Sequence, residues 1–186
     1  HDLDRFRELS RKHGVNAVVA PNFALGAVLM MSLAQLAARH LPDVEIVELH
    51  HDAKRDAPSG TALRTADLIS AARRQTFDRE TAAAPKRETD GRGAERSGIR
   101  VHAVRLPGLV AHQEVLFGAQ GQTLTIRHDA VDRTAFMPGV LLAVREVAAH
   151  RGLMVGLERL LGLEARGEAD QLGGETPPGD DSEVTR

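Results

Sequence analysis

Residues 48–62, with the sequence ELHHDAKRDAPSGTA, are the most informative part of this 186-residue chain. They follow a strand-like segment and end in a Pro-Ser-Gly-Thr turn that opens a helix. Two adjacent imidazoles, His50 and His51, and the amine of Lys54 stand just before that turn. Groups that take and give protons therefore lie beside a helix start that can receive an anion. This pattern predicts a site for a reaction on a small carboxylated molecule.

Each part of this stretch, taken alone, also has a purely structural explanation. His50 alone fits a buried histidine bonded to backbone, and His51 and Lys54 alone fit a solvated strand end. The turn at residues 59–61 alone fits an ordinary helix N-cap. Their occurrence together in one short run favours a carboxylate cradle with an acid/base beside it. A zinc site is not predicted, because neighbouring residues on a strand point to opposite faces and no third strong ligand stands at metal-site spacing.

The chain around this stretch alternates between helical and strand-like patterns. Apolar residues at helical spacing predict helices over 2–13, 26–40, 61–74 and 138–150. Short apolar or alternating runs predict strands over 15–20, 44–49, 99–103, 115–117 and 123–127, with a hairpin turn at 118–121. Polar composition predicts a loop over 77–98 and a disordered tail over 164–186. This order predicts an α+β domain with a mixed, mostly antiparallel sheet and flanking helices.

Composition narrows the classes of protein that the chain can belong to. A formal net charge of −2 gives no electrostatic reason to expect binding to nucleic acid or to an anionic membrane. The chain has no cysteine, which fits a cytoplasmic protein, and no apolar run reaches the roughly 20 residues that span a bilayer. It begins at His1, inside an apparently helical pattern, which predicts a fragment whose upstream half is missing.

Three blocks of the sequence resemble one enzyme family. The stretch 48–62 resembles the signature of the dihydrodipicolinate reductases of the diaminopimelate/lysine pathway. Residues 20–26, APNFALG, are similar to the family segment that follows a strand of its dinucleotide domain, although many members have Ser at the position of Ala24. Residues 104–136 resemble the strands that close its catalytic domain. The sequence at 109–114 looks most like that of the actinobacterial branch.

The resemblance implies roles for the residues of the first block. It implies that His50 is the proton donor and acceptor and that Lys54 is a second proton donor that also meets the substrate. It implies that His51, Gly60 and Thr61 contact substrate carboxylates. The implied reaction is the NAD(P)H-dependent reduction of 4-hydroxy-tetrahydrodipicolinate, with loss of water, to tetrahydrodipicolinate. In that reaction the nicotinamide supplies hydride, and the protein supplies protons and holds the dicarboxylate.

The resemblance also implies a cofactor, NADH or NADPH, and contacts to it. These contacts would fall on Ala20, Pro21, Asn22 and Phe23. The chain contains no G-x-G-x-x-G turn of the kind that wraps a dinucleotide pyrophosphate. We therefore expect this chain alone to bind NAD(P)H poorly and not to turn over. Its first helix and strand would be a βα remnant of a Rossmann-type dinucleotide-binding domain, leaving apolar side chains there exposed.

The expected division of the chain follows from the same comparison. Residues 1–22 would be the dinucleotide-domain remnant, 23–136 the catalytic and oligomerisation domain, and 137–163 C-terminal helices returning to the dinucleotide domain, followed by the tail at 164–186. The resemblance implies a homotetramer that assembles through the sheets of the catalytic domain.

Several assignments stay open at this stage. Many family members have Gly-Glu-His where this chain has Ala-His-Gln at 111–113, so His112 is given no role. His112 and His128 fit sheet-face positions better than ligand positions. Arg133 fits a contact to cofactor or substrate as well as a surface ion pair. Two other functions remain, a non-catalytic dicarboxylate-binding domain and a structural domain that serves oligomer assembly. Loss of turnover on substitution of His50 or Lys54 would separate the enzyme from both.

Overall fold

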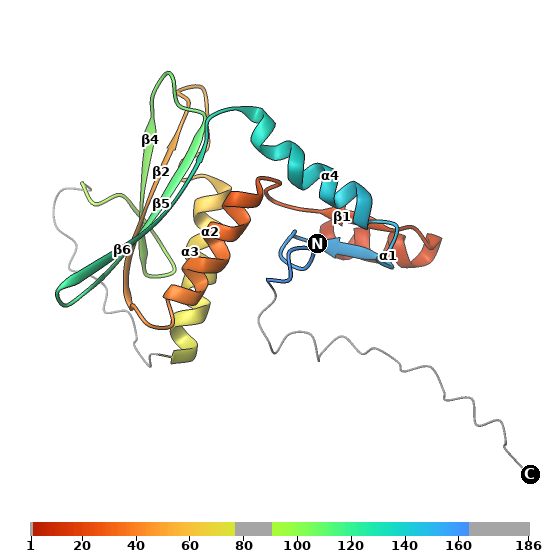
Figure 1. The fold of residues 1–186 in the computed structure, drawn as a ribbon, viewed down its shortest axis with the longest axis horizontal. Helices are drawn as coiled ribbons and strands as arrows, with labels where there is room; N and C mark the ends of the chain where they lie inside the picture. Colours follow the sequence, from red (N-terminus) through yellow and green to blue (C-terminus); the bar gives the residue numbers. More distant parts are fainter. Residues whose placement is uncertain (1, 77–90, 164–186) are drawn as a thin grey trace, which may run out of the picture.

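The computed structural model describes residues 2–76 and 91–163. Figure 1 shows a sheet with two helices on one face, and a smaller unit that helix α4 (Met137–Glu146) joins to it. The predicted tail and most of the predicted loop at 77–98 lie outside the described residues. Within the described part of the chain, no helix is both long and apolar enough to cross a membrane.

The smaller unit contains α1 (Asp2–His13), β1 (Ala17–Val19) and β7 (Leu153–Val155), and its two strands pair in parallel. Helix α1 ends as predicted, because Gly14 follows it with a φ of +61°, a conformation that favours glycine. Strand β1 is shorter than the predicted 15–20. Strand β7 corrects the expectation of helices alone over 137–163, since three apolar residues are too few to show a period.

The larger unit is built around a five-stranded sheet. Its elements are α2 (Leu25–Ala37), β2 (Asp43–His50), α3 (Gly60–Thr76), β3 (Ala94–Arg96), β4 (Ile99–Arg105), β5 (Ala111–Ala119) and β6 (Gln122–Ala130). The strand order is β3-β4-β2-β5-β6, in which β2 and β4 are parallel and every other neighbouring pair is antiparallel. A short 3₁₀ helix, η1 (Arg133–Phe136), then leads into α4. The predicted α+β class with a mixed, mostly antiparallel sheet is confirmed.

Two strand predictions need correction. Strand β3 lies in the region predicted as loop. The strand was not predicted because its three residues are all exposed and carry no apolar alternation. It pairs with β4 through a turn in which Ser97 and Gly98 both have positive φ. Strands β5 and β6 are nine residues long each, longer than the predicted 115–117 and 123–127. Their polar positions continue the ladder on the open face of the sheet, where apolar alternation gives no signal.

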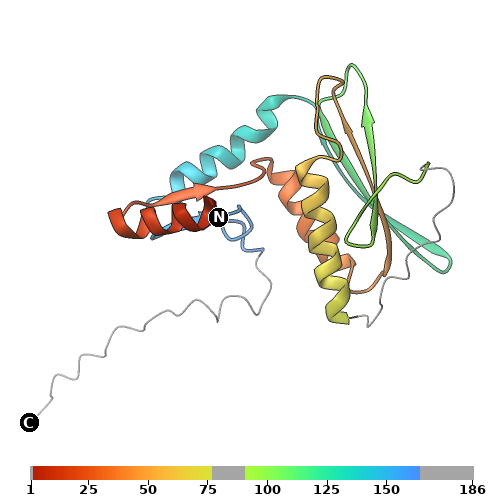
Figure 2. The same ribbon diagram turned by 180° about the vertical axis from the view of Figure 1, so that it is seen from behind.

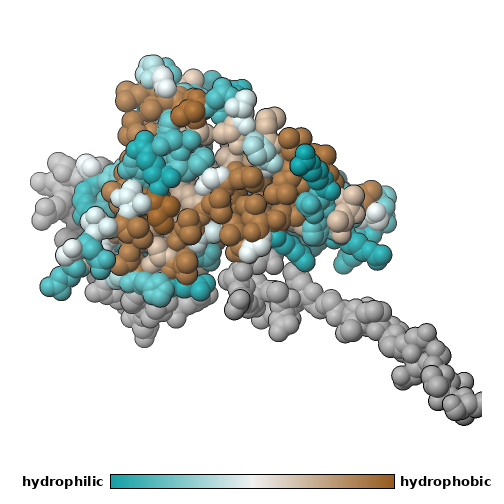
Figure 3. Space-filling model, viewed as in Figure 1, coloured by the Kyte–Doolittle hydropathy of each residue, from teal (hydrophilic) through white to brown (hydrophobic). Residues whose placement is uncertain are grey.

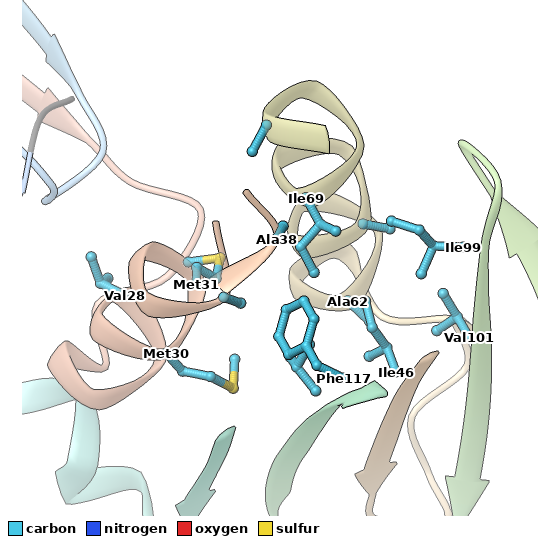
Figure 4. Close-up of a cluster of buried hydrophobic side chains, with 14 of the residues drawn as sticks. Val28, Met30, Met31, Ala38, Ile46, Ala62, Ile69, Ile99, Val101 and Phe117 are labelled. Carbon is cyan, nitrogen blue, oxygen red and sulfur yellow. The ribbon is translucent and has the colours of Figure 1, made fainter. Parts of the chain in front are cut away.

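Helices α2 and α3 cover one face of this sheet, and Figure 2 shows the same arrangement from behind. Strand side chains of one parity, among them Ile46, Val101 and Phe117, point at these helices and are almost fully buried. Figure 4 shows that Met31 of α2 and Ile69 of α3 meet them. Burial of each such side chain contributes about 1.5–3 kcal/mol. Side chains alternate along β2, so Glu48 and His50 face the helices as Ile46 does. Both lie at the end of β2 that is near the start of α3.

The expected apolar exposure in the smaller unit is largely present. The exposed fractions of Leu3, Phe6 and Val19 are 40%, 53% and 36%, whereas Val18 is half-buried against the core. Figure 3 shows further apolar side chains on the surface beside α2 and toward α4. Helix α2 itself carries exposed leucines, among them Leu29 and Leu33.

Candidate functional site

A pocket forms where the end of β2, the start of α3, the linker before α2 and the strands β5 and β6 meet. Its polar lining residues are Asn22, His50, Thr61, His112, Gln113 and His128. Three of the predicted site residues, Asn22, His50 and Thr61, are therefore brought together at one place, although they come from three separate segments.

The linker and the first turn of α3 are joined directly. Asn22 Oδ1 accepts a hydrogen bond of 2.8 Å from the Ala24 backbone N–H, and Asn22 Nδ2 donates one of 3.2 Å to Thr61 Oγ1. The turn itself is capped as predicted, since Ser59 Oγ accepts from the Ala62 N–H at 3.2 Å. The backbone N–H groups at this helix start can therefore face an anion while the side chains hold the turn in place.

Glu48 is a fully buried carboxylate that contacts His50 of the pocket and the turn before α3. One oxygen, Oε2, lies 2.5 Å from His50 Nδ1 and accepts from Arg105 Nη1 at 2.8 Å. The other, Oε1, accepts from Arg105 Nη2 at 2.7 Å and from the Ser59 N–H at 3.0 Å. Burial alone would raise the pKa of Glu48, but the hydrogen bonds from His50, Arg105 and Ser59 outweigh it and lower this pKa to about 2. Glu48 is therefore ionised at neutral pH.

Lys54 and His51 lie outside the pocket lining. The amine of Lys54 donates to both carboxylate oxygens of Asp56, at 2.7 and 2.9 Å. The Lys54 hydrogen bond holds the pKa of Asp56 below its usual range. His51 is exposed, and so is Gly60, at which a Cβ would meet no atom within 4 Å. The described structure thus keeps these three residues near the turn but gathers only His50 and Thr61 of the predicted substrate residues around the pocket.

The four residues predicted to contact a cofactor form the chain between β1 and α2. Ala20 and Phe23 are half-buried against the core, and Pro21 is exposed. Gly139 of α4 packs so closely on this linker that a Cβ there would come within 2.0 Å of the Phe23 carbonyl oxygen. The side chain of Asn22 is used to hold Thr61.

Sequence reasoning missed several residues around the pocket. His128 is half-buried, which lowers its pKa, and its ring fills the space that a Cβ at Gly26 would need. It shares its parity on β6 with the core residue Ile126, and this alternation was an available signal. His112 has partners at both ring nitrogens, because Nδ1 lies 2.7 Å from Asp129 Oδ1 and Nε2 accepts from the Val110 N–H.

Gln113 and Arg133 differ in their burial. Gln113 is buried and donates through Nε2 to Thr65 Oγ1 at 2.8 Å. Arg133 is exposed in η1, a short helix that Asp132 caps by accepting from the Thr134 N–H.

Comparisons with known proteins agree with this architecture. A family model described as "Dihydrodipicolinate reductase, C-terminus" matches residues 26–161. The chain is 52% identical over 163 residues to a 4-hydroxy-tetrahydrodipicolinate reductase of Dehalococcoides mccartyi, covering 87% of this chain and 60% of that protein. It is 56% identical over 162 residues to one of Mycolicibacterium gilvum, covering 87% and 66%. The chain thus spans about 60% of the length of curated relatives it matches.

A solved structure is also similar. It is a dipicolinate-bound dihydrodipicolinate reductase from Paenisporosarcina sp. TG-14, with a TM-score of 0.72, 46% identity, and coverage of 84% of this chain and 59% of that one. The chain belongs to the dihydrodipicolinate reductase family, and residues 26–161 match the C-terminal region of that family.

Proposed function

We propose that this chain supplies the substrate-binding and proton-transfer part of a 4-hydroxy-tetrahydrodipicolinate reductase. The reaction would be the NADH- or NADPH-dependent reduction of the cyclic dicarboxylate, with loss of water, to tetrahydrodipicolinate. The observation that carries this proposal is the meeting of Asn22, His50 and Thr61 at one pocket in a chain of this family. The relative solved with dipicolinate, itself a planar dicarboxylate, supports the substrate class.

In this proposal His50 exchanges a proton with the substrate, because its ring lines the pocket and imidazole takes and gives protons near neutrality. Thr61 and the N–H groups at the start of α3 bind one carboxylate, and the lack of a side chain at Gly60 lets it approach. Lys54 and His51 contact the substrate as well. Lys54 would then exchange its pairing with Asp56 for a substrate carboxylate, an exchange of one anion for another.

The residues proposed to contact the cofactor fit one edge of a nicotinamide site. Ala20, Pro21, Asn22 and Phe23 follow the carboxyl end of a parallel strand, which is where ligands bind in open α/β sheets, and Asn22 reaches the pocket. NADH or NADPH would supply the hydride. This chain's residues contribute only that edge, because no Gly-rich phosphate-binding turn occurs in the sequence. We accordingly assign 1–22 to a remnant of the dinucleotide domain, 23–136 to the catalytic domain and 137–163 to the return segment.

We also propose that the protein forms a homotetramer through its sheet. Helices α2 and α3 cover one face of the five strands, and among the described residues no helix lies on the other (Figures 1 and 2). That open face carries apolar side chains, among them Leu116, between ion pairs such as those of Arg127 with Glu114 and Asp129. A second sheet could bury the apolar positions and retain the paired charges.

A calorimetric titration of the chain with pyridine-2,6-dicarboxylate tests the proposed site. We expect saturable binding that a Lys54→Ala, Thr61→Ala variant loses. A matched control, Lys12→Ala with Thr123→Ala, makes the same changes at exposed positions of α1 and β6 and should bind normally. A folded chain that does not bind, or a double variant that binds as well as wild type, would contradict the site assignment.

A second function would use the cradle at the start of α3, where Asn22 holds Thr61 and Ser59 caps the helix, for binding alone. In that case the chain would be a non-catalytic dicarboxylate-binding domain. Dicarboxylate binding with no turnover of 4-hydroxy-tetrahydrodipicolinate, in a chain joined to a complete dinucleotide domain, would favour this function over the reductase.

A further inference from the structure

We propose that Glu48 is a positioning residue that keeps the His50 proton on Nδ1, so that Nε2 is the ring nitrogen available to the pocket. The inference about the proton stands on the contacts of Glu48 alone. Its importance for proton transfer to a substrate rests on the function proposed above.

The hydrogen-bond donors around Glu48 determine which nitrogen of His50 carries the proton. An ionised carboxylate accepts hydrogen bonds and donates none, and it offers about four acceptor positions. Four contacts reach it: two from the Arg105 guanidinium, one from the Ser59 N–H and one from His50 Nδ1. Arg105 and the backbone N–H can only donate. His50 Nδ1, 2.5 Å from Oε2, must therefore carry a hydrogen as well.

Alternation along β2 makes this contact possible. Glu48 and His50 are two residues apart on the strand, so both side chains lie on its helix-facing side. Strand β4 runs parallel to β2 with His50 opposite Arg105, which places the guanidinium beside both. Arg105 also donates to the Asp56 carbonyl oxygen at 2.7 Å and so connects the carboxylate to the segment before the turn. The carboxylate is thus held from β4 and from the turn before α3, and His50 takes its orientation from a fixed partner.

Stability alone does not account for this arrangement. Burying an ion pair costs desolvation that its attraction often only just repays, and an apolar pair of similar volume is frequently as stable. The fold could fill this position without a charge. A charge is needed, however, if one histidine nitrogen must be kept protonated and its ring kept in one orientation.

Other charged groups near His50 leave Nδ1 to Glu48. Asp56 is paired with Lys54, and Arg105 donates to the oxygens of Glu48. His128 lines the same pocket from β6, and burial lowers its pKa, so it is neutral at and above neutral pH. With Nδ1 protonated, the neutral ring of His50 presents a lone pair at Nε2 that can accept a proton, and the protonated ring can return it.

Nitrogen NMR of the chain labelled with ¹⁵N-histidine tests the inference, with His50 assigned by a His50→Gln variant. At a pH where the ring is neutral, we expect the proton on Nδ1 in the wild type. Glu48→Gln should produce a mixture of the two tautomers or the Nε2–H form, because an amide can donate to Nδ1 as well as accept. A wild-type His50 with its proton on Nε2 would overturn the proposal, and this outcome does not depend on whether Glu48→Gln folds.

A matched control separates positioning from general loosening of the core. Thr65 is buried, accepts from Gln113 and donates to the Thr61 carbonyl oxygen, so Thr65→Val removes two buried hydrogen bonds close to the site and none of those made to the Glu48 carboxylate. Its His50 should keep the Nδ1–H form. If Thr65→Val changes the tautomer as Glu48→Gln does, the role of Glu48 is merely structural.

Addition of pyridine-2,6-dicarboxylate to the same sample distinguishes this inference from the proposed function. We expect the ligand to shift the Nε2 resonance of His50 more than the Nδ1 resonance. An Nδ1–H ring whose two resonances ignore the ligand would contradict the role of His50 in the proposed reaction while leaving its positioning by Glu48 intact.

Discussion

At the scale of single residues, Glu48 and Gly60 give the sharpest tests of the site. Glu48 is a buried charge with donors from three segments, and Gly60 is an exposed helix start with open space at its missing Cβ. One residue connects the site to the stability of the fold. The other can be changed without disturbing the fold, so it reports on ligand binding.

Acidification should destabilise the protein through Glu48. Its pKa is about 2 in the folded chain against 4.5 as the ordinary value, so its stabilising contribution is fully present above pH 4.5 and is lost as pH falls toward 2. The shift corresponds to about 3 kcal/mol. Urea unfolding at a series of pH values should show the stability difference between wild type and Glu48→Gln shrinking over this window. Asp67→Asn, at an exposed pair with Arg96, should track wild type closely. A pH-independent difference for Glu48→Gln would contradict the prediction.

Gly60→Ala should separate folding from binding. A Cβ at Gly60 meets no atom within 4 Å and the residue begins α3, so we expect stability to be unchanged or raised by up to about 1 kcal/mol. Binding of pyridine-2,6-dicarboxylate should fall at least about tenfold, or 1.4 kcal/mol, because the methyl group occupies space that the carboxylate needs. Gly118→Ala on β5, where the space is equally open, should leave binding unchanged. Equal affinities for wild type and Gly60→Ala in calorimetry would place the ligand elsewhere.

At the scale of elements, the site depends on where β2 ends and α3 begins. The strand delivers Glu48 and His50, and the helix delivers its first N–H groups and Thr61. Ser59 caps the start of α3 at Gly60, because its hydroxyl accepts a hydrogen bond from the Ala62 N–H. The stability of the turn and the assembly of the cradle are therefore coupled.

Ser59→Ala should lower the free energy of unfolding by about 1 kcal/mol through loss of this cap. The measurement is urea denaturation followed by far-ultraviolet circular dichroism. Ser32→Ala is the matched control, because Ser32 lies within α2 and its hydroxyl donates to the Val28 carbonyl oxygen of the same helix. Alanine is a better former of helix interiors than serine, so that variant should be neutral or slightly more stable. Equal losses in both variants would argue against a specific cap.

At the scale of the whole molecule, two surfaces expose apolar side chains. One is the apolar side of α1 with Leu3 and Phe6, and the other is the open face of the five-stranded sheet. The first would be covered by the rest of a dinucleotide domain, and the second by other copies of the chain. Both follow from elements that carry an apolar face without a layer to pack on it.

The proposed tetramer predicts a mass near four times 20.1 kDa in light scattering after size-exclusion chromatography. Leu116→Asp places a charge on the open face and should shift the protein to smaller species. Val144→Asp on α4, where the side chain is 63% exposed, should leave the mass unchanged. A wild-type chain that runs as a monomer over a range of concentrations would exclude assembly through this sheet alone.

Local chemistry was enough to predict much of this protein. The periodicity of apolar residues predicted the helices and the central strands, because these elements depend on side chains close together in the sequence. The run 48–62 indicated the family and pointed to His50 and Thr61 as site residues. Tertiary packing decided the rest. It alone brings Arg105 to Glu48 across 57 positions and Asn22 to Thr61 across 39, pairs β7 with β1, and turns His128 into the pocket while Lys54 stays with Asp56. Such contacts depend on which strands lie side by side and in what register, and no short-range pattern encodes that choice.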